Sequence, residues 1–212
     1  MRFVTVLAAI LVMMTGCART SQPGGESTFD DDTKSPDQYR VRLDTSKGPV
    51  VIEVTRGWAP RGSDRFHLLV KRNFYDQNRF FRVIPNFVVQ FGIHALPEEH
   101  ARWAEAMIPD DPRVQSNKRG MVTFAMRGPN TRTTQIFISL ADNGMLDQQG
   151  FAPFGKVVEG MEHVDQLYGG YGEGAPNGNG PAQQMVTARG NAYLLENFPK
   201  LDFIQRATIV ER

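Results

Sequence analysis

FFRVIPNFVVQFG, residues 80–92, is the most informative stretch of the chain. It contains two runs of β-branched and aromatic residues, Phe80 to Ile84 and Phe87 to Phe91, which is the composition of β-strands. Pro85 and Asn86 interrupt the pattern, because proline removes a donor from the ladder and asparagine tolerates turn dihedral angles. The stretch therefore predicts two strands separated at the Pro-Asn step.

Arg82 is the one charged residue inside this apolar stretch. Its guanidinium cannot lose its proton, and burying it without a partner costs roughly several kcal/mol. The nearest acids in the sequence, Asp76 and Glu98, do not stand beside it. Arg82 either pairs with a carboxylate or lines a cleft that receives a ligand, and we expect the cleft.

Phe87 and Gln90 fall on opposite faces of a strand that alternates strictly, because successive side chains point to opposite sides. If both side chains serve one site, the strand has to bulge or bend between them.

A second set of candidate site residues lies in residues 119–140, RGMVTFAMRGPNTRTTQIFISL. This segment predicts two strands joined by a loop that contains Gly-Pro-Asn. Within the second run Gln135, Phe137 and Ser139 share one face. This face offers an amide and an aromatic ring to a ligand. Residues 143–161, NGMLDQQGFAPFGKVVEGM, follow as a loop and a further strand.

The order and spacing of these residues, together with the run FGKVVEGM, resemble the cyclophilins from about Tyr39 to Val210. The resemblance implies a closed antiparallel eight-stranded barrel capped by two helices, and many short strands with two amphipathic helices independently suggest such a barrel. It also implies prolyl isomerase activity. The implied catalytic residues are Arg82 and Gln90, and the implied substrate-binding residues are Phe87, Val88, Ala125, Gln135, Phe137, Met145 and Leu146.

Two positions depart from the animal members of this family. Met145 stands where they carry a tryptophan, and the loop around Gly150 and Phe151 lacks their histidine. Cyclosporin binding, which depends on that tryptophan, is therefore not implied.

These residue types suit rotation about a prolyl bond, whose barrier of about 18–20 kcal/mol comes from amide resonance. As the bond twists, the proline nitrogen regains its lone pair, and a donor such as Arg82 stabilises the twisted state more than the planar one. Gln90 can orient Arg82 or hold the substrate carbonyl. The mechanism requires no cofactor, and neither the scattered histidines nor the single cysteine predicts a metal site.

The amino terminus predicts export. Residues 1–16 have a short charged start and a hydrophobic stretch typical of a signal peptide. They end before Cys17 in a sequence that resembles the lipobox of bacterial lipoproteins, whose cysteine is lipidated. Residues 17–38 would then be a polar tether, and residues 39–212 the isomerase domain. An ordinary signal peptide is the alternative, with Cys17 removed or left as an incidental thiol.

In the body of the chain, alternating apolar residues predict a hairpin over residues 39–54. Helical spacing after Pro60 and over Met161 to Tyr168 predicts two helices, and Glu98 to Met107 predicts a short helix in an insertion. The glycine-rich run 169–181 lacks any nucleotide-binding motif and is interpreted as a flexible surface loop.

We therefore expect a monomeric, lipid-anchored peptidyl-prolyl isomerase of a bacterial envelope, facing the periplasm or the exterior, that acts on proline-containing segments of unfolded or flexible proteins. Removal of residues 1–16 leaves 23 basic and 23 acidic residues, so charge gives no case for a nucleic-acid partner. The alternative is a catalytically weak module or chaperone that binds proline-containing peptides. A small-ligand-binding barrel lipoprotein is a third reading, but it leaves the grouping of Arg82, Gln90 and Gln135 unexplained.

Overall fold

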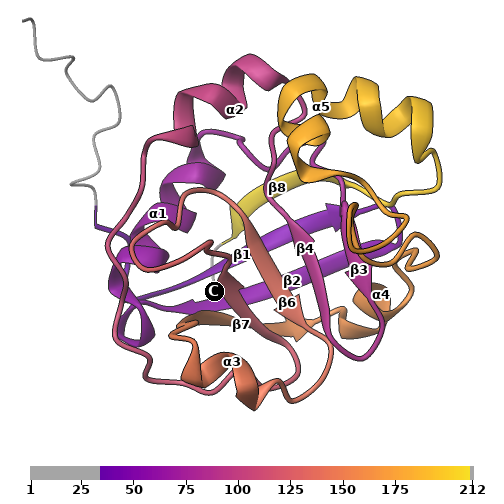
Figure 1. The fold of residues 1–212 in the computed structure, drawn as a ribbon. Helices are drawn as coiled ribbons and strands as arrows, with labels where there is room; N and C mark the ends of the chain where they lie inside the picture. The colour runs from indigo at the N-terminus through magenta and orange to yellow at the C-terminus, as the bar shows by residue number, and fades with distance from the viewer. Residues whose placement is uncertain (1–33, 211–212) are drawn as a thin grey trace, which may run out of the picture. The chain divides into compact units, whose positions relative to one another are not determined.

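The computed structural model describes residues 34–210, which form one antiparallel sheet of eight strands with helices packed against it (Figure 1). The strands are β1 Gln38–Thr45, β2 Gly48–Thr55, β3 Arg82–Ile84, β4 Val88–Phe91, β5 Met121–Phe124, β6 Ile136–Ser139, β7 Pro153–Glu159 and β8 Ile204–Val210. The predicted signal peptide, Cys17 and most of the predicted tether lie outside the described residues.

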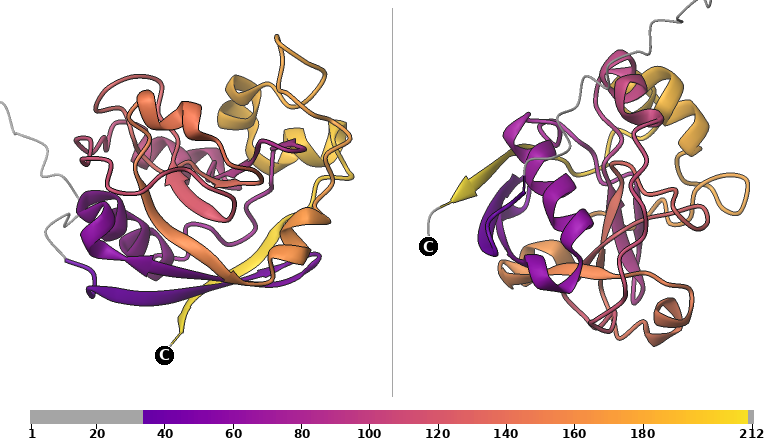
Figure 2. Two further views of the ribbon diagram at one scale, coloured as in Figure 1. Left: turned by 90° about the horizontal axis from the view of Figure 1, so that it is seen from below. Right: turned by 90° about the vertical axis from the view of Figure 1, so that its left-hand side faces the viewer.

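The strands follow the order β3-β4-β6-β5-β7-β2-β1-β8, and every neighbouring pair is antiparallel. The sheet is strongly curled (Figure 2), and a bridge between Arg79 and Phe203 joins the segments that precede its two outer strands. The predicted eight-stranded antiparallel fold is thereby confirmed, in the form of a curled half-barrel. The predicted hairpin is also confirmed, since Val41 pairs with Ile52 and Leu43 with Val50.

The described helices are η1 Arg56–Trp58, α1 Pro60–Lys71, α2 Pro97–Ala104, α3 Gly144–Gln148, α4 Met161–Asp165 and α5 Gln183–Asn197. α1 confirms the helix predicted after Pro60 and buries Phe66, Leu69 and Val70 on one face. α2 confirms the short helix of the insertion. α4 is shorter than its predicted stripe, and α5 was not predicted.

The insertion around α2 is fastened to the start of α1 through Asp111, whose side chain is buried. Its carboxylate accepts the backbone N–H groups of Arg61 and Gly62 at 3.0 and 2.9 Å, and it pairs with Arg132 at 3.0 Å. A carboxylate at this position satisfies free N–H groups of the first helical turn. Through Arg132 it also holds the loop that leads to Gln135.

α5 packs beside the start of β3 and the end of β4, because its buried residues Val186 and Leu194 share a cluster with Phe81 and Ile93, which flank those strands. Figure 1 shows α5 beside α2 at one end of the sheet. Gly190 interrupts α5 with φ 56° and ψ −142°, a conformation essentially restricted to glycine. A Cβ there would overlap the carbonyl oxygen of Ala95, so glycine allows the helix to approach the loop before α2 closely.

The folded domain begins before residue 39. Ser35 is buried, its hydroxyl lies 2.9 Å from that of Ser63, and its backbone N–H donates to Asp64 at 2.8 Å. The last residues of the predicted tether therefore pack on α1. Among residues 34–210 no helix combines the length and the apolar character needed to cross a membrane.

We expect Gly190→Ala to lower the free energy of unfolding by about 2–4 kcal/mol, because alanine is strained in this conformation and its Cβ pushes α5 away from Ala95. Gly57→Ala is the matched control, since Gly57 has open space around its Cβ position; it should change stability by less than about 0.5 kcal/mol. Urea denaturation measures both. Equal effects of the two substitutions would contradict the packing described for α5.

Candidate active site

The centre of the site is a row of residues that stand directly opposite one another on adjacent strands. Arg82 of β3 pairs with Gln90 of β4, Gln90 with Phe137 of β6, and Phe137 with Thr123 of β5. Residues directly opposite on antiparallel strands point to the same face. Strand register therefore brings together the arginine, one glutamine and one aromatic ring that the sequence predicted for a single site.

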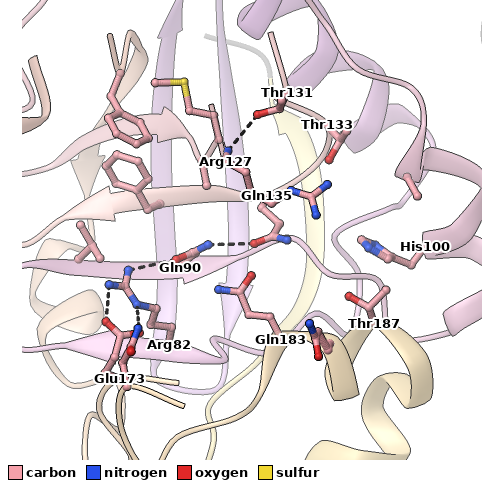
Figure 3. Close-up of a pocket in the computed structure, with 18 of the residues that line it drawn as sticks. Arg82, Gln90, His100, Arg127, Thr131, Thr133, Gln135, Glu173, Gln183 and Thr187 are labelled. Atoms are coloured by element: carbon pink, nitrogen blue, oxygen red, sulfur yellow. Dashed lines mark hydrogen bonds and ion pairs between the residues drawn. The ribbon is translucent and has the colours of Figure 1, made fainter. Parts of the chain in front are cut away.

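Hydrogen bonds connect Arg82 and Gln90 and continue to Gln135, and these three side chains form the polar row of the site (Figure 3). Nη1 of Arg82 donates to Oε1 of Gln90 at 3.2 Å, and Nε2 of Gln90 donates to Oε1 of Gln135 at 2.9 Å. Gln90 is buried and therefore needs both partners. Of its two predicted roles, orientation of Arg82 is the one that this geometry supports directly.

An apolar surface adjoins the polar row. Val88, Phe137 and Leu146 form a buried cluster, and Phe87, Ala125 and Phe151 pack against it. The rings of Phe137 and Phe151 meet edge to face with centroids 5.7 Å apart, and the guanidinium carbon of Arg82 lies 5.6 Å from the Phe87 ring centroid. A charged donor thus borders a surface suited to a small apolar ring.

Phe87 reaches this surface without a bulge in β4. The strand begins at Val88, and Phe87 lies in the preceding turn, where its N–H donates to the carbonyl of Ile84 at 3.0 Å. Asn86 takes a positive φ of 59°, which asparagine tolerates. Strict alternation therefore does not apply to Phe87, while Val88 and Gln90 share a face as the period of two requires.

These residues line a cavity of about 900 Å³. Eight of the nine predicted site residues lie on its wall: Arg82, Phe87, Val88, Gln90, Ala125, Gln135, Phe137 and Leu146. Met145 is not among them, and its side chain in α3 is 62% exposed. The structure therefore does not bring Met145 into the site.

The sequence did not predict a second wall of this cavity. This second wall is formed by α2 and the residue that follows it, the loop before β6, the glycine-rich segment and the start of α5. The residues that these segments contribute to the cavity include His100, Glu105, Thr133, Glu173, Gln183 and Thr187. The glycine-rich segment lies at the surface as predicted, but internal backbone hydrogen bonds shape it, including those from Ala175 and Asn177 to Gly180 and Gly174. It is part of the site and not a plain connecting loop.

Arg82 has a carboxylate partner, which corrects the expectation that it lines a cleft without one. Its Nε and Nη2 donate to the two carboxylate oxygens of Glu173, each at 2.7 Å. The hydrogen bond from Arg82 lowers the pKa of Glu173, so this carboxylate is ionised at neutral pH. This pair could not be predicted from the sequence, because Glu173 follows Arg82 by 91 residues and lies in an irregular loop.

His100 is the one histidine on the cavity wall. Its side chain is buried, and within the described residues its Nδ1 has no hydrogen-bond partner. Burial, with a smaller contribution from His94, lowers the pKa of His100. The imidazole is therefore neutral at pH 7 and adds no charge to the cavity.

Comparison with known proteins agrees with this geometry. Residues 40–187 match the model of the family described as cyclophilin type peptidyl-prolyl cis-trans isomerase/CLD. A peptidyl-prolyl cis-trans isomerase of Acinetobacter baylyi is 35% identical over 132 residues, which are 60% of this chain and 70% of that protein.

Solved structures show the same fold. A cyclophilin type peptidyl-prolyl cis-trans isomerase of Cryptosporidium parvum aligns with a TM-score of 0.61 at 19% identity, over 82% of this chain and 99% of that one. Its crystal structure in the presence of the dipeptide Ala-Pro aligns with a TM-score of 0.60 at the same identity and coverage.

We expect His100 in the folded protein to titrate below its ordinary pKa of about 6.5. Because the folded state disfavours the charged imidazole, this residue's contribution to stability is complete above the unfolded pKa and is lost as the pH falls below it. NMR titration of the ring protons measures the folded value, and the chain unfolded in urea supplies the reference. A folded pKa above the unfolded one would contradict the buried, neutral state.

Proposed function

The chain belongs to the cyclophilin-type peptidyl-prolyl cis-trans isomerases, and we propose that it catalyses isomerisation by presenting the guanidinium of Arg82 to the prolyl bond that rotates. One observation carries this proposal: the guanidinium is fixed at the border between the polar row and the apolar cluster of Val88, Phe137 and Leu146. A proline ring on that cluster brings its nitrogen next to a permanently charged donor.

The chemistry follows from the electronic structure of the amide. In the planar states the proline nitrogen shares its lone pair with the carbonyl and is a poor acceptor. In the twisted transition state the lone pair returns to nitrogen, so a hydrogen bond from Arg82 strengthens as the barrier is crossed. The guanidinium remains charged throughout, and no proton has to move.

The apolar cluster supplies the orientation. Phe87, Phe137 and Leu146 exclude water from one side of the ring, and a charged hydrogen bond is stronger where water is excluded. Uncatalysed isomerisation takes on the order of 10–100 s. Millisecond turnover requires about four decades of acceleration, or roughly 5–6 kcal/mol. One charge-assisted hydrogen bond of about 1.5–3 kcal/mol and an oriented, desolvated prolyl group together reach this magnitude.

We expect Arg82→Ala to lower kcat/KM for a short proline-containing peptide by about two decades or more, because the substitution removes the donor and leaves the apolar cluster in place. The soluble fragment from residue 34 onward is the enzyme for the assay, and its circular dichroism spectrum reports whether the variant folds. A folded variant with wild-type activity would contradict the role of Arg82. A folded wild type that binds the peptide without accelerating isomerisation would favour the alternative function, a proline-peptide-binding module.

The substrates are inferred to be proline-containing segments of unfolded or flexible proteins. The cavity of about 900 Å³ is large enough for several residues of extended chain. The Cryptosporidium parvum isomerase was crystallised in the presence of Ala-Pro, which supports a prolyl dipeptide unit as ligand of the family's site.

The cellular location is inferred from the sequence. The hydrophobic stretch within residues 1–16 and the lone Cys17 support export and lipidation of the mature chain at a bacterial membrane. Folding of envelope proteins is the process that an isomerase at this location would assist. Because one acyl chain binds a membrane only weakly, stable attachment requires the several chains that a lipoprotein carries.

We expect the full-length chain, expressed in a bacterium that processes lipoproteins, to fractionate with membranes, and Cys17→Ser to move it to the soluble fraction. Ser21→Ala, a substitution in the same tether, is the matched control and should leave the fractionation unchanged. Mass spectrometry of the amino-terminal peptide checks for acyl groups on Cys17. A soluble wild type without acyl groups would point to an ordinary cleaved signal peptide.

A further inference from the structure

The contact between Arg82 and Glu173 has a specific geometry. The carboxylate takes Nε and Nη2, the side edge of the guanidinium, at 2.7 Å each, while Gln90 takes one N–H of Nη1 at 3.2 Å. Figure 3 shows the carboxylate and the amide approaching the guanidinium from different directions. Such a bidentate pair fixes the plane of the guanidinium as well as its position.

These contacts leave donors for a substrate. A guanidinium has five N–H groups, and the bonds to Glu173 and Gln90 use three of them. Nη1 and Nη2 carry two N–H groups each, so one remains on each nitrogen. Glu173 therefore occupies the side edge of Arg82 without exhausting the donors on its outer nitrogens.

The glycine-rich segment is folded around Glu173. The carboxylate of Glu173 accepts a hydrogen bond from the N–H of Gly174 at 2.9 Å, and the backbone carbonyl of Glu173 accepts one from the N–H of Gly180 at 2.8 Å. A Cβ at Gly178 would overlap the carbonyl oxygen of Glu173, and one at Gly180 would lie 2.8 Å from it. The glycines thus permit the close approach that closes the loop around this residue.

The loop is also anchored to the domain close to Glu173. The ring of Tyr171, two residues earlier, packs edge to face against Tyr168 and Phe198, with centroids 5.0 Å apart in both pairs. Tyr171 also packs against the cluster that holds α5 beside β3 and β4. Glu173 therefore extends from a fixed support toward Arg82.

Solvent exposure indicates what the ion pair contributes. The side chain of Glu173 is 37% exposed and that of Arg82 is 19% exposed. Ion pairs open to solvent add little to stability. The ion pair instead orients the guanidinium of Arg82. An arginine free to sample rotamers would have to be ordered during the reaction.

We propose that Glu173 is a positioning residue for isomerisation, which holds the side edge of the Arg82 guanidinium so that the remaining N–H groups of Nη1 and Nη2 face the rotating prolyl bond. This rests on the proposed role of Arg82 as the donor. The glycine-rich segment and α5 are then working parts of the active site. The lowered pKa of Glu173 is consistent with a permanently ionised partner at neutral pH.

The experiment measures kcat and KM for a short proline-containing peptide with Glu173→Gln. The glutamine amide nitrogen faces an arginine donor, so the bidentate pair cannot form. We expect kcat to fall by about ten- to a hundredfold, as for a misplaced catalytic group, with KM changed by less than about threefold. Glu173→Asp, too short to reach both donors, should lose part of the activity and gives a second, independent variant. Glu196→Gln removes the exposed ion pair to Arg189 at 2.8 Å and is the matched control, with wild-type kinetics expected.

Arg82→Ala separates positioning from structural damage. If Glu173 acts through Arg82, adding Glu173→Gln to Arg82→Ala should change kcat by less than about twofold. An equal loss in both backgrounds overturns the proposal in favour of a structural role. Higher activity of Glu173→Gln overturns it in favour of a carboxylate that competes with substrate for Arg82. Full activity of Arg82→Ala alone overturns the donor role and, with it, the role of Glu173.

Discussion

A guanidinium cannot lose its charge, and the active site is organised around the one that Arg82 places beside an apolar cluster. Its five N–H groups need hydrogen-bond acceptors and its positive charge needs a partner, because burying the group without them costs roughly several kcal/mol. Gln90, Glu173 and the ring of Phe87 meet part of this requirement. The N–H groups that remain without an acceptor are available to a substrate. The charge that has to be partnered inside the protein is therefore also the charge that does the chemistry.

The sheet explains why so much of the site could be predicted from the sequence. Side chains alternate with a period of two, so Gln135 and Phe137 had to share a face, and strand register then placed Phe137 opposite Gln90 and Gln90 opposite Arg82. Alternation did not predict the position of Phe87, because this residue lies in the turn before β4. The cyclophilin resemblance added the eight-stranded antiparallel architecture and the grouping of these residues into one site, which alternation alone does not determine.

The second wall could not be predicted for a physical reason. The ion pair between Arg82 and Glu173 joins residues 91 positions apart, and the segment that supplies Glu173 has no periodicity to read. α5 carried a weak signal, since Val186, Gly190 and Leu194 are spaced by four, but a central glycine argues against a helix. Here that glycine marks the kink that lets α5 approach Ala95. Met145 differs from the other predicted site residues, because it lies outside the cavity wall with its side chain exposed in α3, although its family position implied a substrate contact.

In the proposed mechanism the proline ring lies on the apolar cluster with its nitrogen facing Arg82, and a crystal structure with a bound Ala-Pro-containing peptide would show this arrangement. We expect the ring against Phe87, Phe137 and Leu146, with Nη1 or Nη2 of Arg82 within hydrogen-bonding distance of the prolyl amide and the bond to Glu173 retained. A peptide bound elsewhere in the cavity, or one that displaces Glu173 and takes the side edge of Arg82, would contradict it.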